Sequence, residues 1–251
     1  MTAARIVIVD DEQPARGRLR ELLGDCAAEF PHAVVGEAAN GIEGLELVAQ
    51  TPADLALVDI HMPGMSGIEF ARHLQVLETP PAVIFITAHD QYAVQAFEVN
   101  AVDYLLKPVR AARLLAALKK SSGGAPLARE VLERIDPNPR RYFSVAERGR
   151  VTLVPVSEVL FLKAEQKYVT IRTREREFLI EDALAQLEKE FAATFVRIHR
   201  NCLVARAQIR GVERSSAEDG DAGWAVVLEG WVDRLPVSRR QWTALKELLK
   251  A

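Results

Sequence analysis

The chain has 251 residues, of which 49% are hydrophobic and 27% charged, and its formal net charge at pH 7 is -3. This composition excludes disordered and collagen-like chains, and because one hydrophobic core usually serves about 100–200 residues, the length predicts two domains. No apolar run reaches the roughly 18–20 residues of a membrane span and the N-terminus has no secretory signal pattern, so we expect a cytoplasmic protein. Two cysteines, Cys26 and Cys202, stand far apart and indicate neither a disulfide framework nor a zinc site.

The first half of the sequence alternates short apolar runs with stretches of helical periodicity. The apolar runs, each predicted to be a strand, cover residues 6–9, 33–38, 55–59, 82–88 and 103–106. Apolar stripes at helical spacing are formed by Leu19, Leu22 and Leu23, by Ile42, Leu45 and Val48, and by Leu114, Leu115 and Leu118. Strands that are apolar on both faces and alternate with helices are typical of a parallel sheet covered on both sides. We therefore expect an α/β doubly wound domain with a five-stranded parallel sheet.

A change of composition and charge divides the chain. Residues 121–141 concentrate Ser, Gly and Pro around one short helical pattern, which is typical of a hinge. Residues 1–123 carry 10 Lys and Arg against 16 Asp and Glu, whereas residues 138–251 carry 20 against 16. The basic excess of the second half permits nucleic-acid binding, although exposed helices also collect Arg and Lys. We expect two domains at residues 1–121 and 140–251, joined by a linker at 122–139.

The second half is predicted to be a mostly β module. Its candidate strands have mixed or alternating polarity and cover residues 141–147, 150–156, 159–165, 168–173, 177–182, 196–205 and 224–230. The longest helical patterns are an acidic one at 181–191 and a terminal one at 239–249. Several short strands separated by turns indicate an antiparallel arrangement.

Carboxylates follow two of the strands predicted for the first half. Asp10 and Asp11 end the first apolar run, and Asp59 ends the third. Because ligands bind outside the carboxyl ends of the strands in an open parallel sheet, we expect these three side chains to meet. Their mutual repulsion is large unless a cation lies between them, and Mg2+ prefers such oxygen ligands. The sequence therefore predicts a Mg2+ site at this edge.

Two further polar residues, Thr87 and Lys107, follow the fourth and fifth strands at the same edge. A lysine ammonium and a hydroxyl are suited to phosphate oxygens, and a carboxylate can attack a phosphoryl group to become an aspartyl phosphate. Asp59 is the candidate nucleophile because the turn after it, HMPGMSG, would expose it. Taken singly, each of these residues has a structural interpretation as a helix cap, a strand residue or a solvated charge.

Together these signals make residues 5–119 resemble the receiver domain of bacterial two-component response regulators. The matching motifs are the pair Asp10–Asp11, LVDIHMPGMSG around Asp59, FITAHD with Thr87, and YLLKP with Lys107 and Pro108. The resemblance implies that a sensor histidine kinase or a small phosphodonor phosphorylates Asp59. It also implies a Mg2+ ion held by Asp11, Asp59 and the main-chain carbonyl of His61, with help from Asp10 through water.

The same resemblance implies a switch. Lys107 would pair with the phosphoryl group, aimed by a cis bond before Pro108, while Thr87 moves to that group and Tyr104 follows inward. A predicted helix at 91–101, with His89 and Asp90 at its start, would carry the change. With the helix at 110–120, it would form the surface on which receivers of this type commonly dimerise.

Two enzyme interpretations are disfavoured by the sequence. The chain has no GxxxxGK[ST] loop, and its adjacent Asp10–Asp11 pair differs from the Asp-x-Asp pattern of haloacid dehalogenases. We therefore expect a regulatory switch and not an enzyme, apart from limited self-phosphorylation and self-dephosphorylation.

The second half lacks the recognition helix of helix-turn-helix proteins, so nucleic-acid contacts would come from loops and strand ends. The best candidate is FVRIHRNCLVA (195–205), where His199, Arg200 and Asn201 are suited to phosphates and base edges. Two other segments supply cations: EQKYVTIR (165–172) contains Lys167, and PVSRRQW (236–242) contains Arg239 and Arg240.

Residues 140–248 resemble the LytTR DNA-binding domain. The matching segments are VLFLKAEQKYVTI, ALAQLEKEF, FVRIHRNCLV and LPVSRRQWTALKELL. The resemblance implies a compact β fold that inserts loops into successive major grooves of a direct-repeat site in double-stranded DNA. The implied contacts fall on Lys167 or Tyr168, on His199, Arg200 and Asn201, and on Arg239 or Arg240. The whole chain resembles the AlgR/LytR-type transcription regulators.

The sequence thus predicts a phosphorylation-controlled transcription regulator that acts on promoter DNA as a homodimer. The alternative is a receiver whose β module binds a protein or an RNA. Cys202 adjoins the candidate DNA-contact segment, where it is either a buried structural thiol or an oxidation sensor.

Overall fold

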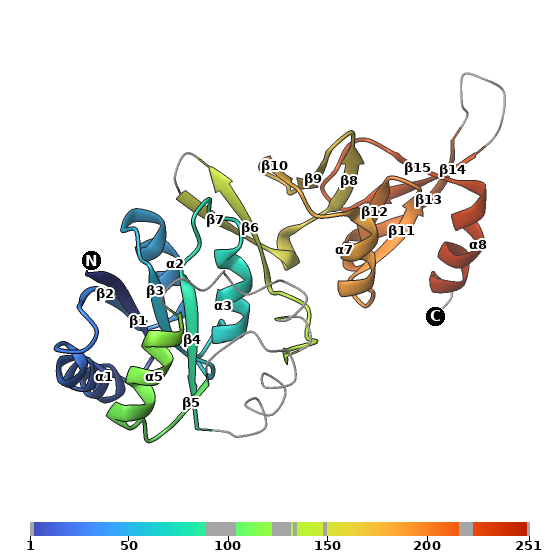
Figure 1. Ribbon diagram of the computed structural model, residues 1–251. Coiled ribbons are helices and arrows are strands. Elements are labelled where there is room, and N and C mark those ends of the chain that lie inside the picture. The colour runs from blue at the N-terminus through green and yellow to red at the C-terminus, as the bar shows by residue number, and fades with distance from the viewer. Residues whose placement is uncertain are drawn as a thin grey trace. The chain divides into compact units, whose positions relative to one another are not determined.

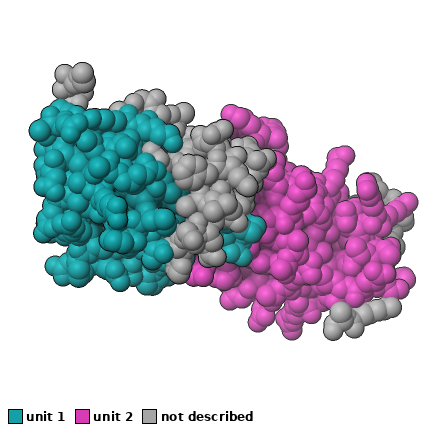
Figure 2. Space-filling model, turned by 60° about the horizontal axis from the view of Figure 1, so that its bottom comes forward, with its two compact units in different colours: residues 1–138, 146–152 teal, residues 139–145, 153–251 magenta. Residues whose placement is uncertain are grey.

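The protein is described by a computed structural model in which two compact units are resolved (Figure 1). The structure describes residues 3–88, 104–121, 132, 135–147, 150–215 and 223–249. Figure 2 colours unit 1, which comprises residues 1–138 and 146–152, and unit 2, which comprises residues 139–145 and 153–251. Among the helices in these described ranges, none has the length and apolarity needed to cross a bilayer.

Unit 1 contains a five-stranded parallel sheet in the order β2-β1-β3-β4-β5. Its strands are β1 (Ala4–Val9), β2 (His32–Ala38), β3 (Leu55–Asp59), β4 (Ala82–Thr87) and β5 (Tyr104–Leu106). The helices are α1 (Gln13–Cys26), α2 (Gly41–Gln50), α3 (Gly67–Leu74) and α5 (Ala111–Ser121). The predicted α/β fold is confirmed, because each apolar run of the first half that was predicted to be a strand contributes to a parallel strand.

Helices cover both faces of this sheet (Figure 1). On one face, α1 and α5 pack through Leu22 and Leu114 against β1 and its neighbours, whose buried side chains include Ile8 and Ile84. On the other face lie α2 and α3, which contact each other. Contrary to the predicted apolar stripe of α2, Ile42 is 39% exposed. It occupies the second position of the helix, where its side chain lies off the core-facing side.

Part of the predicted linker is buried. In the described part of residues 122–139, Leu132 and Ile135 are at most 2% exposed. These two side chains are therefore packed inside the protein.

Unit 2 is mostly β, as predicted. Its five-stranded antiparallel sheet, in the order β10-β9-β8-β12-β11, is formed by β8 (Phe161–Glu165), β9 (Tyr168–Arg172), β10 (Glu177–Ile180), β11 (Phe195–His199) and β12 (Cys202–Ala205). A three-stranded sheet contains β13 (Ile209–Ser215), β14 (Gly223–Leu228) and β15 (Leu235–Val237). A hairpin contains β6 (Tyr142–Glu147) and β7 (Arg150–Pro155), of which residues 142–145 and 153–155 belong to unit 2 and the others to unit 1. The helices are η1 (Val156–Glu158), α7 (Leu184–Glu190), η2 (Arg206–Gln208) and α8 (Arg239–Leu248).

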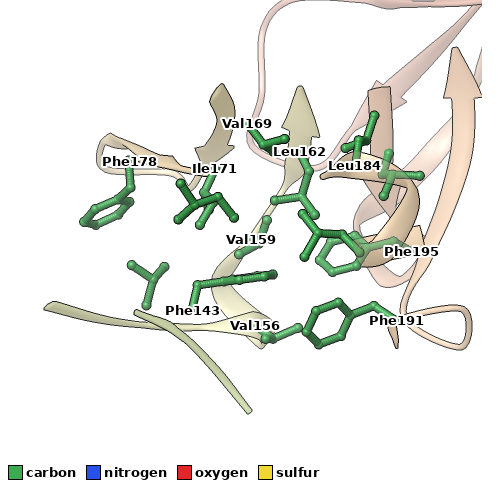
Figure 3. Close-up of a cluster of buried hydrophobic side chains, with 14 of the residues drawn as sticks. Phe143, Val156, Val159, Leu162, Val169, Ile171, Phe178, Leu184, Phe191 and Phe195 are labelled. Carbon is green, nitrogen blue, oxygen red and sulfur yellow. The ribbon is translucent and has the colours of Figure 1, made fainter. Parts of the chain in front are cut away.

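One core of unit 2 lies on the face of the five-stranded sheet that carries Leu162 and Ile171 (Figure 3). Phe143, from β6, is completely buried there and lies 5.2 Å from the ring of Phe191. The ring of Phe191 in turn meets Phe195 edge-on at 5.8 Å. The start of the hairpin thus belongs to the core of the C-terminal half.

A second core covers the other face of β8, β12 and β11. It joins Ile198 and Val204 to Val226 of β14 and Leu245 of α8. Trp242 of α8 stacks on Trp224 with ring centroids 4.1 Å apart and an interplanar angle of 7°. This stacking fixes the first turns of α8 against the three-stranded sheet.

Two strand predictions need correction. The segment 196–205 is not one strand, because residues 200 and 201 form a turn between β11 and β12. Two strands, β13 and β15, were not predicted, and both pair with β14. The predicted helix at 91–101, with His89 and Asp90 at its start, lies outside the described residues.

Candidate functional sites

The predicted acidic site forms at the carboxyl ends of β1 and β3. Asp10, Asp11 and Asp59 each place a carboxylate oxygen within 4.8 Å of the others. Asp10 is completely buried and Asp59 is 5% exposed, whereas Asp11 is exposed. Three carboxylates at this separation are a hard-oxygen donor set, which is the chemistry that Mg2+ requires. The residues present therefore fit the predicted ion.

Lys107 holds two of these carboxylates. Its Nζ donates to Asp10 Oδ2 over 3.0 Å and lies 3.3 Å from Asp59 Oδ1. Burial disfavours the ammonium, but the hydrogen bond to Asp10 and the charge of Asp59 outweigh it, so the pKa of Lys107 is raised. Lys107 is therefore a fixed positive charge at the edge of the acidic site.

Burial raises the pKa of Asp59, and the negative charges of Asp10 and Asp11 act in the same direction against the attraction of Lys107. A divalent cation between the carboxylates would remove this repulsion and favour the ionised form. A further positive charge in this site would therefore stabilise the ionised Asp59 carboxylate.

The backbone after Asp59 is fixed by a glycine. Gly67, the first residue of α3, donates its N–H to the Ile60 carbonyl over 2.9 Å. A Cβ at this position would lie 2.1 Å from the Asp59 carbonyl oxygen, so no other residue fits without movement. The start of α3 is therefore packed directly on the main chain of the candidate phosphoacceptor.

The remaining predicted receiver residues are placed as follows. Thr87 is buried at the end of β4, and its carbonyl accepts the N–H of Lys107 over 2.8 Å. Tyr104 is 5% exposed and lies 5.3 Å from the ring of Phe85, so its side chain is already inside in this structure. His61 is exposed in the loop after β3. The predicted cis bond between Lys107 and Pro108 is present.

One residue of this site was missed by the sequence analysis. Arg16, on α1, donates from Nη1 to the main-chain carbonyl of Asp10 over 2.7 Å and pairs with Glu37 at 3.3 Å. An Arg four residues after Glu12 on a helix has no distinguishing sequence signal, because its target is a main-chain oxygen.

The three candidate DNA-contact segments of unit 2 meet at one end of the five-stranded sheet. The Ala164 N–H donates to the main-chain carbonyl of Asn201 over 2.8 Å. This bond places the end of β8 and the following turn beside the β11–β12 turn. The Ser238 N–H donates to the Ile198 carbonyl over 2.9 Å, which places the start of α8 there too. Segments that are far apart in the sequence thus form one surface.

The β11–β12 turn presents its side chains in a defined arrangement. Arg200 is exposed, and His199 and Asn201 are partly exposed. His199 Nδ1 lies 2.5 Å from Asn201 Oδ1, and since an amide oxygen only accepts, the imidazole donates its Nδ1–H in this contact. The side-chain amide nitrogen of Asn201 carries two N–H donors.

Exposed cations flank this turn. Arg239 and Arg240 are exposed at the start of α8, and Lys167 is exposed in the turn between β8 and β9. The preceding residue, Gln166, has a φ of 53°, which a tight two-residue turn requires. Tyr168 is 39% exposed, with Lys167 Nζ 5.5 Å from its ring centroid. The surface therefore combines cations, amide donors and an aromatic side chain.

Two residues beside this turn were also missed. Arg197 donates to the carbonyls of His199 and Arg200, and it pairs with Glu188 of α7. No sequence pattern marks Arg197, because its partners are main-chain oxygens and a carboxylate from another element.

Comparison with known proteins identifies both halves. The response regulator receiver domain family matches residues 6–119, and the LytTr DNA-binding domain family matches residues 149–250. The positive alginate biosynthesis regulatory protein of Pseudomonas aeruginosa PAO1 is 41% identical, with 97% of this chain and 98% of that protein covered. An uncharacterized response regulatory protein of Vibrio cholerae serotype O1 is 36% identical, with 97% of each covered.

Two further similarities have lower sequence identity. Sensory transduction protein LytT of Bacillus anthracis is 31% identical, with 98% of this chain and 99% of that protein covered. Among solved structures, the response regulatory domain of mrkE from Klebsiella pneumoniae is 30% identical, with a TM-score of 0.42 and coverage of 47% of this chain and 95% of that chain. The matches to both domain families, together with relatives similar over nearly the whole length, show that the chain belongs to the response regulators of the AlgR and LytT kind, in which a receiver domain is joined to a LytTR DNA-binding domain for transcriptional regulation.

Proposed function

We propose that phosphorylation of Asp59, by a sensor histidine kinase or a small phosphodonor, controls dimerisation and the sequence-specific binding of double-stranded DNA. The domains would be residues 1–121 and 140–251 with a linker at 122–139. The observation that carries the proposal is the meeting of Asp10, Asp11, Asp59 and Lys107 in one partly buried site. Such a site suits the transfer of a phosphoryl group to a carboxylate.

The receiver residues would divide the work of phosphoryl transfer. Asp11, Asp59 and the His61 carbonyl would hold Mg2+, with Asp10 acting through water, and the bound ion would neutralise charge on the phosphoryl oxygens. Asp59 would be the nucleophile. Lys107, now paired with Asp10 and Asp59, would supply a positive charge to the phosphoryl group.

The switch would start at Thr87, whose hydroxyl would bond a phosphoryl oxygen. Tyr104, on the strand paired with the end of β4, would be held inward as a result. The surface formed with α5 would then favour a homodimer, and limited self-dephosphorylation would reset the site. A change of nearly two charges is sufficient to bias such a two-state element.

The DNA contacts would come from the surface at the end of the five-stranded sheet. Lys167 or Tyr168, the turn residues His199, Arg200 and Asn201, and Arg239 or Arg240 would contact a direct-repeat promoter site. Amide donors suit base edges, and exposed Arg and Lys suit phosphates. Three projecting segments on one surface support contact with successive parts of a duplex.

The phosphorylation step is tested with the full chain, MgCl2 and acetyl phosphate. We expect the intact mass to rise by one phosphoryl group in the wild type and in Asp25→Asn, an exposed carboxylate of α1. Asp59→Asn, or addition of EDTA, should abolish the increase. Phosphorylation of Asp59→Asn to the wild-type level would contradict the assignment of the phosphoacceptor.

DNA binding is tested by selecting duplexes from a random pool with the full chain at physiological salt. We expect enrichment of a repeated short motif, with an affinity that falls steeply as salt rises because counterions are released. His199→Ala and Arg239→Ala should lose this affinity while retaining the wild-type unfolding transition. Absence of enrichment by a folded, phosphorylated chain would favour the alternative of a protein or RNA partner.

A further inference from the structure

The turn between β11 and β12 is braced from inside the domain by Arg197. Its Nε donates to the His199 carbonyl over 3.3 Å, and its Nη2 donates to the Arg200 carbonyl over 2.6 Å. The third arm, Nη1, pairs with the carboxylate of Glu188 on α7. One guanidinium therefore joins two main-chain oxygens of the turn to a helix on the other side of the hairpin.

The geometry of the turn depends on these bonds. The regular pairing of β11 with β12 shifts between Arg197 and His199, so the strand ladder does not itself fix the carbonyl directions there. Arg197 satisfies two of these carbonyls, and the Ala164 N–H satisfies that of Asn201. The main-chain oxygens are thereby held by the protein, and the side chains of His199, Arg200 and Asn201 are left to project.

Arg197 also removes negative charge from the surface near the turn. A carbonyl turned toward a phosphate would oppose binding, and so would the carboxylate of Glu188, which is 42% exposed in its side chain. Arg197, whose side chain is only 20% exposed, neutralises Glu188 and occupies the carbonyls. Its own donors are engaged inside the domain, so its role differs from that of an exposed phosphate-binding arginine.

We propose that Arg197, held by Glu188, is a positioning residue that sets the conformation of the β11–β12 turn for sequence-specific recognition of duplex DNA. The proposal rests on the proposed DNA-binding function and names a determinant of its specificity. Arg197 orders the contact residues without contacting a base or a phosphate itself.

The chain contains a matched control. Arg206 follows β12 and donates from Nη2 to the Ala192 carbonyl over 2.8 Å and from Nε to the Phe195 carbonyl over 3.3 Å. It thus braces carbonyls at the opposite end of the same hairpin. Arg206→Met removes a comparable pair of bonds but leaves the turn at residues 200 and 201 intact.

The test uses the full chain and two fluorescent duplexes, one enriched from a random pool by the wild type and one with the same bases shuffled. We expect Arg197→Met to lose about tenfold in affinity for the enriched duplex with little change for the shuffled one, because two bonds to the turn are removed. Its salt dependence should keep the wild-type slope, whereas Arg239→Met should reduce the slope by about one unit. Arg206→Met should bind both duplexes as the wild type does.

A double variant separates the ion pair from the bonds to the turn. Exchanging the charges, Glu188→Arg with Arg197→Glu, restores a pair but cannot donate to the carbonyls of residues 199 and 200. We expect no recovery of the affinity. Full recovery of affinity in the double variant would overturn the proposal. So would an unchanged affinity in Arg197→Met, or a salt slope of that variant reduced by about one unit. An equal loss of affinity in Arg206→Met would overturn it too.

Amide hydrogen exchange of residues 199–202 tests, without DNA, whether Arg197 orders the turn. We expect faster exchange there in Arg197→Met than in Arg206→Met, and equal rates would overturn the positioning role. If the wild type enriches no duplex, the proposed function fails, and the exchange rates still decide whether Arg197 orders the turn.

Discussion

Arg72, on α3, donates from Nη1 to the main-chain carbonyl of Asn138 over 2.9 Å, although 66 positions separate the two residues. The same guanidinium also donates to the carbonyls of Leu132 and Asp136. One side chain therefore binds three main-chain carbonyl oxygens, at residues 132, 136 and 138. Residues 132, 136 and 138 of unit 1 are thus bound by a helix that begins beside Asp59.

Replacement of Arg72 is expected to release this segment. Arg72→Met removes three charge-assisted bonds to carbonyls, so the free energy of unfolding should fall by about 2–4 kcal/mol. Hydrogen exchange at residues 135–138 should become faster under conditions in which the rest of the protein stays folded. Arg18→Met, which removes only an exposed pair with Glu21, is the control and should change neither quantity. Unchanged exchange rates at residues 135–138 would show that Arg72 does not hold this segment.

Gly67 is expected to tolerate no side chain. Gly67→Ala places a Cβ against the Asp59 carbonyl, and the unfolding free energy should fall by about 3 kcal/mol or more. Gly24→Ala, in α1, adds a Cβ that would meet no atom within 4 Å beyond its chain neighbours and the backbone of its own helix, and it should instead stabilise the protein by up to about 1 kcal/mol. Urea titrations of the two variants measure this difference. A fall in the unfolding free energy of Gly67→Ala as small as that of an ordinary surface substitution would contradict the prediction.

Lys107 and a divalent cation are expected to act on the same carboxylates. In EDTA, Lys107→Met should lose about 1–3 kcal/mol, because Asp10 and Asp59 lose their positive partner. Adding MgCl2 should stabilise this variant more than the wild type, since the ion then binds without competition. Lys119→Met, which breaks an exposed pair with Glu29, provides the reference. An equal response to Mg2+ in all three proteins would exclude the shared site.

Cys202 is expected to be an inert thiol. Burial raises its pKa to about 12, against the opposing effect of Lys163, so the thiol is protonated in the folded state at neutral pH. Because the folded pKa lies above the ordinary value of 9.0, the corresponding stability is present below about pH 9 and is lost as the pH rises toward 12. Iodoacetamide should label native Cys202 slowly at pH 8 and rapidly after unfolding.

The same burial predicts that oxidation of Cys202 does not regulate the protein. Cys202→Ala should keep the wild-type response of duplex affinity to hydrogen peroxide, as should Cys26→Ala. A peroxide effect that disappears only in Cys202→Ala would show that this thiol is a sensor.

The second domain is expected to begin before the range matched by its family. Phe143 is buried in the core, and Arg140 pairs with Glu190 at 3.0 Å and with Asp182 at 3.1 Å. A fragment of residues 140–251 should therefore unfold cooperatively, whereas one of residues 149–251 should not. Within the longer fragment, Phe143→Ala should cost about 3–5 kcal/mol, and Leu179→Ala, at a 57% exposed position, should change little. Cooperative unfolding of the shorter fragment would contradict this boundary.

Much of the receiver was predictable from the sequence because its signals are local. A run that is apolar on both faces identifies a buried parallel strand, and the residue after it lies at the carboxyl edge. The strand pattern of the sequence therefore predicts that Asp10, Asp59 and Thr87 lie at the same edge of the sheet. It also separated an acidic α/β half from a basic β half. It failed at residues 200 and 201, where polar side chains inside a strand pattern conceal a turn.

The amino-acid sequence by itself determined which segments of the first half form strands, the chemistry at the ends of those strands and the candidate contact residues of the second domain. Only the tertiary structure decided that Lys167, Asn201 and Arg239 share one end of a sheet, because antiparallel pairing and the Ser238 bond to Ile198 bring distant segments together. The roles of Arg72 and Arg197 were likewise decided by the fold. Their partners are main-chain carbonyls, which every residue carries, so no choice of side chain in the sequence marks them.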